Sequence, residues 1–149
     1  MPETTQTETP VFTREYRNAV DAQWRVTVPS AWRFADRAEF YIRRRTDHLE
    51  VFPRSELDRF LAWANALPGR DRVDALEEWG NTTEQVKIDS AGRLTLPLKW
   101  AKEVGIDVKQ NAVLLGAIVN FKIWNETQYD TVAAERRVRG KTLLEKYDG

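Results

Sequence analysis

The sequence predicts an α+β protein built from two similar halves, because one short pattern occurs twice. Residues 20–32 have the sequence VDAQWRVTVPSAW, and residues 88–100 have the sequence IDSAGRLTLPLKW. The residues that recur at one constant offset are Asp21, Arg25 and Pro29 in the first segment and Asp89, Arg93 and Pro97 in the second. Each segment is followed by two strand-like runs and then by a helical pattern. The predicted order in each half is therefore β-turn-β-α-β-β-α.

The first half begins with strand-like pieces on either side of a turn at residues 21–24. Residues 26–28 alternate between apolar and polar side chains, which is the period of a half-buried strand. Pro29 has a fixed φ and no N–H donor, so it favours the start of a short helix over residues 30–37. Residues 39–44 and 49–52 alternate like the strands of a hairpin, and helical spacing then predicts a long helix that Pro68 stops.

The second half repeats this order after a connecting helix at residues 71–79 and a turn at Gly80 and Asn81. Its predicted elements are strands at 84–88 and 94–96 around a turn at 89–92, a helix at 97–104, a hairpin of 112–118 with 121–124, and a helix at 126–139. The predicted division of the chain is a disordered tail at 1–10, a first repeat at 11–66, a connector at 67–82, a second repeat at 83–139, and a charged, fraying tail at 140–149. One repeat of about 60 residues buries little surface alone, so we expect the two to pack together.

Composition excludes several classes of protein. The chain has 149 residues, a formal net charge of +0 and a pI of about 6.6, which argues against a histone-like polycation but leaves room for a local basic patch. The absence of cysteine excludes disulfides and thiolate metal sites. No apolar run approaches the roughly 20 residues of a membrane span, and the N-terminus lacks the pattern of a signal peptide. We therefore expect a cytoplasmic protein with no membrane partner.

The repeated Asp-x-x-x-Arg turn is the strongest candidate for a functional site. A carboxylate at the start of a tight turn can accept backbone N–H bonds and can hold the arginine four residues later in one pose. The remaining guanidinium donors could then contact phosphates or the edge of a guanine. The alternative is that Asp21–Arg25 and Asp89–Arg93 are ion pairs that only staple their turns. The sequence leaves both interpretations open.

Two other features have two interpretations each. Arg43, with Arg44 and Arg45, could touch phosphates beside a hairpin turn, although a charged strand edge that resists aggregation is commoner. Trp24 occupies the turn position that Gly92 has in the second copy, so it is either a packing anchor against a neighbouring subunit or a contact with a ligand. We expect Trp32 to lie in a core or an interface, and His48 to be exposed in a turn.

Signals for an enzyme are poor. The chain contains a single histidine, and it has no HExxH motif, glycine-rich phosphate loop or Gly-x-Ser-x-Gly motif. No pair of carboxylates combines a suitable spacing with an apolar setting for acid–base work. We therefore predict no catalytic residue, no cofactor, no metal and no small-molecule substrate.

At its two Asp-x-x-x-Arg turns, which are followed by VTVP and LTLP, the chain resembles the MraZ family in the wider SpoVT-AbrB group of bacterial DNA-binding domains. The resemblance covers about residues 11–132, including the LEVFP and FKIW strands before the two long helices. It implies a double-split, swapped-hairpin β-barrel made of two AbrB-like halves, and assembly into rings. It also implies a nucleoid-associated regulator that binds G-rich repeats upstream of the division and cell-wall gene cluster.

Carried over by the resemblance, the DNA-binding residues are Asp21, Arg25, Asp89 and Arg93. If the chain is such a regulator, we expect Arg14, Arg17 and Arg43 to add contacts with the DNA backbone. The first turn departs from the family, which has Lys-Gly where this chain has Gln23 and Trp24. Because a positive φ is costly for tryptophan, we expect that turn to be reshaped. The predicted partners are double-stranded DNA and further copies of the chain. The alternative function is a ring-forming protein-interaction scaffold that has lost sequence-specific DNA binding. An antitoxin-like partner fits less well because that arrangement has one motif copy per chain.

Overall fold

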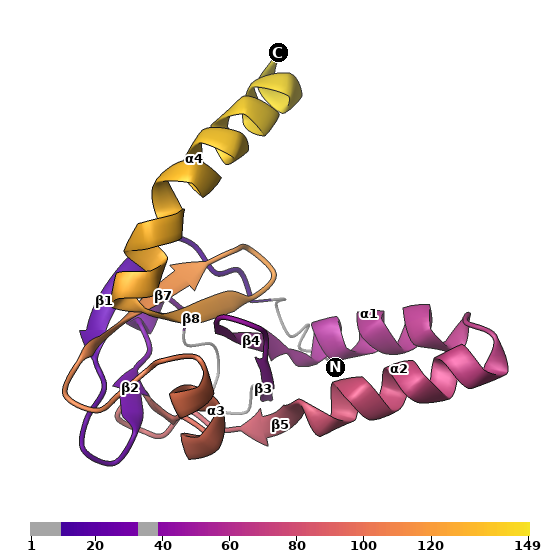
Figure 1. The fold of residues 1–149 in the computed structure, drawn as a ribbon, viewed down its shortest axis with the longest axis horizontal. Coiled ribbons are helices and arrows are strands. Elements are labelled where there is room, and N and C mark those ends of the chain that lie inside the picture. Colours follow the sequence, from indigo (N-terminus) through magenta and orange to yellow (C-terminus); the bar gives the residue numbers. More distant parts are fainter. Residues whose placement is uncertain (1–9, 33–38) are drawn as a thin grey trace, which may run out of the picture.

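A computed structural model describes residues 10–32 and 39–149, which form a body of strands with two projecting helical parts (Figure 1). The strands are β1 (Glu15–Ala19), β2 (Arg25–Thr27), β3 (Phe40–Arg44), β4 (Leu49–Pro53), β5 (Thr83–Val86), β6 (Arg93–Thr95), β7 (Asn111–Gly116) and β8 (Phe121–Asn125). The helices are the 3-10 helix η1 (Ser30–Trp32) and the α-helices α1 (Arg54–Asn65), α2 (Gly69–Asn81), α3 (Leu98–Glu103) and α4 (Glu126–Asp148). The α+β class and both predicted hairpins are confirmed.

The two halves exchange strands. One six-stranded sheet has the order β1-β7-β8-β4-β3-β5, in which all neighbours are antiparallel, and β2 pairs with β6 in a separate two-stranded ribbon. β1 of the first half therefore pairs with β7 of the second, and β5 of the second half pairs with β3 of the first. Among the described residues, the hydrogen-bonded strands do not close into a barrel.

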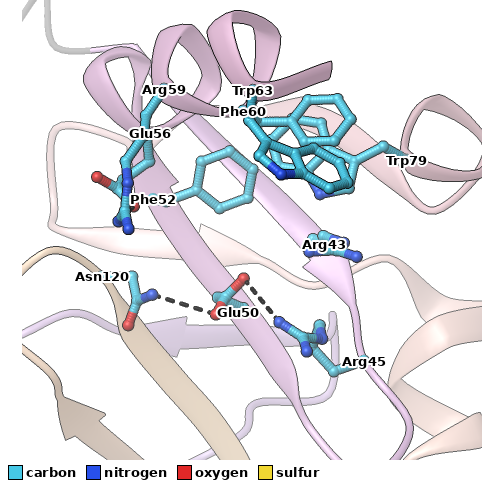
Figure 2. Close-up of a pocket in the computed structure, with 10 residues that line it drawn as sticks. All are labelled: Arg43, Arg45, Glu50, Phe52, Glu56, Arg59, Phe60, Trp63, Trp79 and Asn120. Atoms are coloured by element: carbon cyan, nitrogen blue, oxygen red, sulfur yellow. Dashed lines mark hydrogen bonds and ion pairs between the residues drawn. The ribbon is translucent and has the colours of Figure 1, made fainter. Parts of the chain in front are cut away.

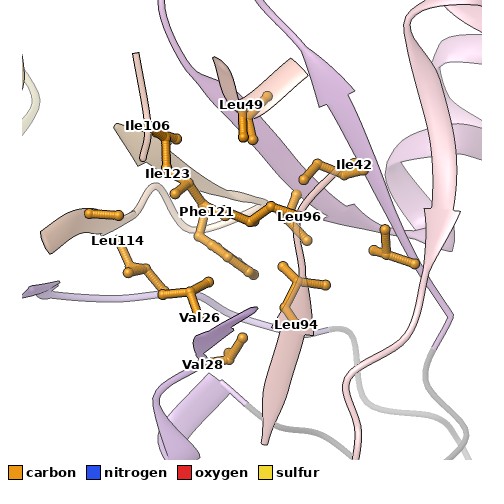
Figure 3. Close-up of a cluster of buried hydrophobic side chains, with 14 of the residues drawn as sticks. Val26, Val28, Ile42, Leu49, Leu94, Leu96, Ile106, Leu114, Phe121 and Ile123 are labelled. Atoms are coloured by element: carbon orange, nitrogen blue, oxygen red, sulfur yellow. The ribbon is translucent and has the colours of Figure 1, made fainter. Parts of the chain in front are cut away.

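The core lies between the ribbon and the sheet (Figure 3). Val26 and Leu94 face each other in the ribbon and are both fully buried, and they pack in one cluster with sheet residues such as Leu114. Trp32 lies in the same cluster, where its Nε1 donates a hydrogen bond of 2.7 Å to the carbonyl oxygen of Thr13. The prediction that Trp32 is a core residue is therefore confirmed. The ribbon can bury one face only by packing on the sheet, which fixes the opposite face outward.

Helix α2 is longer than the sequence predicts. The predicted turn at Gly80 and Asn81 is wrong, because both residues belong to α2. A glycine inside an exposed helix costs only about 1 kcal/mol relative to alanine, so it does not by itself end a helix. The helix ends instead at Thr82, whose Oγ1 donates a hydrogen bond of 2.9 Å to the carbonyl oxygen of Glu78.

Only the first part of the predicted helix at residues 30–37 lies within the described chain, because residues 33–38 are outside it, as are residues 1–9.

Helix α4 runs to Asp148, well beyond the end predicted for this helix at residue 139. Its first turn is capped by Asn125, whose Oδ1 accepts a hydrogen bond of 2.8 Å from the backbone N of Gln128. Beyond Gly140 the sequence holds no proline, and the Arg139–Glu135 ion pair of 2.8 Å supports the preceding turn. The end of α4 points away from the body (Figure 1). None of the described helices has the length and apolar character required to cross a membrane.

Gly116 provides a test of the contact between β7 and the segment before β1. A Cβ added at Gly116 would lie 2.6 Å from the backbone C of Phe12 and 2.6 Å from the backbone N of Thr13. We expect Gly116→Ala to lower the free energy of unfolding by about 1–3 kcal/mol, measured by urea denaturation. The matched control is Gly80→Ala, where nothing lies within 4 Å of the new Cβ and the helix should gain up to about 1 kcal/mol. Equal effects of the two changes would contradict this account.

Candidate functional site

The first turn is held by one carboxylate. Oδ1 of Asp21 accepts hydrogen bonds of 2.9 Å from the backbone N of both Gln23 and Arg25, and Oδ2 accepts one of 2.8 Å from Nε of Arg25. Two backbone bonds close the turn, from Asp21 N to the Arg25 carbonyl oxygen at 2.9 Å and from Trp24 N to the Asp21 carbonyl oxygen at 3.0 Å. The carboxylate thus fixes both the backbone and the arginine.

The second turn repeats this arrangement. Oδ1 of Asp89 accepts hydrogen bonds of 2.9 Å from the backbone N of Ala91 and of Arg93, and Oδ2 accepts one of 3.1 Å from Nε of Arg93. The predicted role of the aspartates in holding the turn and the arginine is confirmed in both copies. Neither aspartate is deeply buried, so these contacts orient the arginines more than they add stability.

The ribbon brings the two arginines onto one face. Arg25 lies opposite Thr95, and Arg93 lies opposite Thr27, with the buried pair Val26 and Leu94 between them. Side chains alternate along a strand, so Arg25 and Arg93 both point to the face that is turned away from the core. Their positions are diagonal neighbours, which places the Cα atoms about 7–8 Å apart. Two turns that are far apart in sequence thus present one pair of guanidinium groups.

The two arginines differ in their free donors. A terminal amino group of Arg25 also donates a hydrogen bond to Oε1 of Gln23, so two of its nitrogens are engaged within the turn. In the described chain, Arg93 uses only Nε, and both of its terminal amino groups lack a protein partner. Arg93 is therefore the better placed of the two to form new bidentate hydrogen bonds.

Trp24 takes the same backbone conformation as the glycine in the other copy. Its φ is 63°, and the φ of Gly92 is 81°. The expectation that tryptophan would reshape this turn is wrong, because the same backbone bonds close both turns. The cost of the left-handed conformation is offset where the indole packs on the core, with Nζ of Lys102 5.9 Å from its ring centre. Trp24 is thus a packing anchor within its own chain.

Both turn aspartates have a lowered carboxyl pKa. The pKa of Asp21 and of Asp89 lies below the ordinary value of 3.8, mainly because the backbone N–H of Arg25 or Arg93 donates to the ionised carboxylate. Partial desolvation acts in the opposite direction in each case. The aspartates are therefore ionised throughout the neutral range, and both arginines keep their partner charge.

Arg17 lies outside this face and is already paired. Its guanidinium lies 2.8 Å from Asp130, 3.1 Å from Glu126 and 3.2 Å from Glu15. These carboxylates raise the pKa of Arg17 and tie β1 to the start of α4. Arg14, just before β1, is exposed and has a φ of 74°. It lines a hollow with Arg136 and Arg137 beside α4.

Arg43 is also remote from the ribbon. It is half-buried on β3 beneath the hairpin of α1 and α2, with its guanidinium 5.3 Å from the centre of the Trp79 ring. In Figure 1 this hairpin projects from the side of the body that carries β3 and β5, whereas β2 lies toward β1 on the other side. Of the arginines predicted to bind DNA, Arg25 and Arg93 share the outer face of the ribbon, whereas Arg17 and Arg43 lie elsewhere.

His48 is buried, with 7% of its surface exposed, so the expectation that it is exposed is wrong. Its ring stacks on Trp124 at a centroid distance of 4.6 Å, and Nδ1 lies 2.7 Å from Oδ1 of Asp47. Burial lowers the pKa of His48. Sequence reasoning missed this contact because Trp124 belongs to the other half of the chain. Across the described ranges, no group of three or more His, Asp or Glu side chains could hold a metal ion.

Known proteins resemble this chain over most of its length. A family model described as "MraZ protein, putative antitoxin-like" matches residues 81–141, which include the second turn. The chain is 30% identical over 152 residues to "Transcriptional regulator MraZ" of Cereibacter sphaeroides, with 89% of each chain covered. A protein of the same name from Rickettsia felis is 30% identical over 129 residues, covering 80% of this chain and 85% of that protein. Another, from Lachnoclostridium phytofermentans, is 25% identical over 123 residues, with 81% and 86% covered.

The second turn allows a direct test of what lowers the aspartate pKa. Arg93→Ala removes the guanidinium but keeps the backbone N–H bonds to Asp89. The pKa of Asp89 should therefore rise toward its ordinary value of 3.8 without reaching it. A carboxyl group with a lowered pKa stabilises the folded state at any pH above the ordinary pKa of that group. This stabilisation is lost as the pH falls through the lowered pKa. Carboxyl-detected NMR titration measures both aspartates, and Asp21 in the same variant is the control. A pKa of Asp89 at or above 3.8 would overturn the backbone contribution.

Proposed function

Because the chain belongs to the MraZ family, we propose that it is a sequence-specific DNA-binding regulator of transcription. The observation that carries this proposal is the pair of arginines on the outer face of the ribbon, each held by an aspartate of its own turn. The relatives described above are named transcriptional regulators, which is not a class of enzyme. The family and the site thus support the same class of function.

The chemistry of the ribbon suits a duplex. A two-stranded antiparallel ribbon fits the major groove of B-form DNA, where a guanine presents two acceptors to a guanidinium group. Arg93, with both terminal amino groups free of partners in the described chain, is the proposed base or phosphate contact of the second turn. Arg25 has the same role in the first turn, where Gln23 shares its guanidinium. Asp21 and Asp89 are positioning residues that keep these donors in place before DNA binds.

The other candidate arginines divide into two groups. Arg14 is exposed next to β1 and remains a proposed contact with the DNA backbone. Arg17 is held by three carboxylates, and Arg43 lies beneath the α1–α2 hairpin. Releasing them for DNA would break these contacts, so we leave both out of the proposed interface.

We also propose the assembly that the family resemblance implies, a ring of several copies that acts in the cytoplasm on repeated promoter sites of the division and cell-wall gene cluster. The exchange of strands between the halves supports the proposed swapped-hairpin barrel. A ring would place many arginine pairs along the DNA, so that weak single contacts add up to tight binding. Sedimentation velocity tests the assembly, and a species with the mass of one chain would overturn it.

The DNA-binding proposal predicts a specific loss in two variants. Arg93→Ala and Arg25→Ala should each weaken binding to a duplex from upstream of the protein's own gene by about 1–3 kcal/mol per site and reduce the preference over a scrambled duplex. Fluorescence anisotropy measures both quantities. The matched control is Arg70→Ala, because Arg70 is exposed on α2, away from the ribbon.

The salt dependence of duplex binding distinguishes a DNA-binding regulator from a protein-interaction scaffold. Binding to DNA through arginines should weaken steeply as the salt concentration rises. Arginines that neutralise phosphates release the counterions condensed on the DNA, and added salt opposes that release. A protein-interaction scaffold would bind neither duplex near physiological salt. Unchanged binding and preference in both arginine variants would place the interface elsewhere on the molecule.

A further inference from the structure

A cavity of about 330 Å³ lies between the α1–α2 hairpin and the sheet (Figure 2). Phe60, Trp63 and Trp79 form the wall on the helical side, and Arg43 and Glu50 lie on the strands below. The volume is within the range of small-molecule pockets. The cavity lies away from the proposed DNA-binding face, and nothing in that proposal uses it.

The helical wall is aromatic and keeps one side open. The rings of Phe60 and Trp79 stack at a centroid distance of 4.0 Å, and Trp63 lies 6.0 Å from Phe60. Trp63 nevertheless remains 59% exposed, so one face of its ring is accessible. Its indole therefore offers a flat surface on which another ring can stack.

In the described part of the chain, the charges around the cavity leave Arg43 without an ion-pair partner. Glu50, only 9% exposed, accepts a hydrogen bond of 3.1 Å from Nδ2 of Asn120 and lies 3.5 Å from Arg45. Glu56 lies 3.4 Å from Arg59, so each carboxylate at the cavity has its own arginine. Within the described residues, Arg43 has no carboxylate in ion-pair range.

Arg43 is the polar group most poorly satisfied in this cavity. Its Nε is buried and has no hydrogen-bond partner in the described chain, and burial lowers the pKa of its guanidinium. The buried Oδ1 of Asn120 also has no partner there. Unsatisfied buried groups cost free energy, so a ligand that accepts hydrogen bonds from the guanidinium of Arg43 offsets part of that cost. The guanidinium of Arg43, which has no ion-pair partner among the described residues, is complementary to a single negative charge.

We propose that this cavity binds a small molecule that carries a flat aromatic ring and a single carboxylate. The carboxylate accepts hydrogen bonds from the guanidinium of Arg43, and the ring lies against the indole of Trp63. The ligand would be bound and not converted, since the cavity presents no nucleophile and no acid–base pair. The proposal stands independently of DNA binding.

The test uses the full chain labelled with 5-fluorotryptophan and titrated with indole-3-acetate. The ¹⁹F signals of Trp63 and Trp79, assigned with Trp63→Phe and Trp79→Phe, should shift saturably, whereas those of the buried Trp32 and Trp124 should not. Neutral indole-3-acetamide should bind more weakly by about ten- to a hundredfold, the value of a hydrogen bond to a charged group. Saturable shifts at all tryptophans, or none, would overturn the proposal.

Two variants identify the contacts. Arg43→Gln should weaken indole-3-acetate about tenfold or more and leave the amide unchanged, whereas Arg72→Gln, an exposed change on α2, should alter neither. Trp63→Ala changes an exposed side chain, so the fold is retained even if Arg43→Gln disturbs it, and it should weaken the acid and the amide alike. Equal affinity of wild type and folded Arg43→Gln for the acid would overturn the charge contact. Tighter binding of a tetrapeptide ending in tryptophan would assign the cavity to a chain terminus instead.

Discussion

Neither half of this protein completes a sheet with its own strands. β1 needs β7, β5 needs β3, and the ribbon needs one strand from each half. This exchange explains why two turns from distant parts of the chain act as one site. Because β2 and β6 are equivalent strands that run antiparallel, equivalent residues meet across an approximate two-fold axis. Arg25 and Arg93 are therefore brought together by the pairing of backbones, and no direct contact between the side chains is required.

The sequence predicted the parts of the site that depend on short-range bonds. The hydrogen bonds of Asp21 and Asp89 involve only the next four residues, so the motif alone contains them. The exchange of strands could not be derived from periodicity, which says that a strand has one buried face but not which strand lies beside it. The resemblance implied a swapped arrangement, and periodicity alone did not. The burial of His48 was missed for the same reason, since Trp124 comes from the other half.

Arginines of this chain that look alike in sequence lie in different environments. Arg17 is surrounded by carboxylates, Arg43 lies against an indole, and Arg93 keeps its terminal donors free in the described chain. A count of charges treats the three as equal, and the net charge of +0 conceals the difference. What distinguishes them is the number of donors left over after the fold has formed. By that measure, the ribbon and the cavity under the helical hairpin are two places, within the described residues, where an arginine keeps donors available for a ligand.

The exchange of strands also bears on how the chain is made. A ribosome releases β1 well before the strand that pairs with it, Asn111–Gly116. The hydrogen-bonding edge of β1 therefore stays open until β7 has been synthesised. A chain truncated before β7 would leave that edge unpaired, and the edge could then pair with a strand of another molecule. Synthesis of β7 is thus the event that separates correct folding from strand exchange between neighbouring molecules.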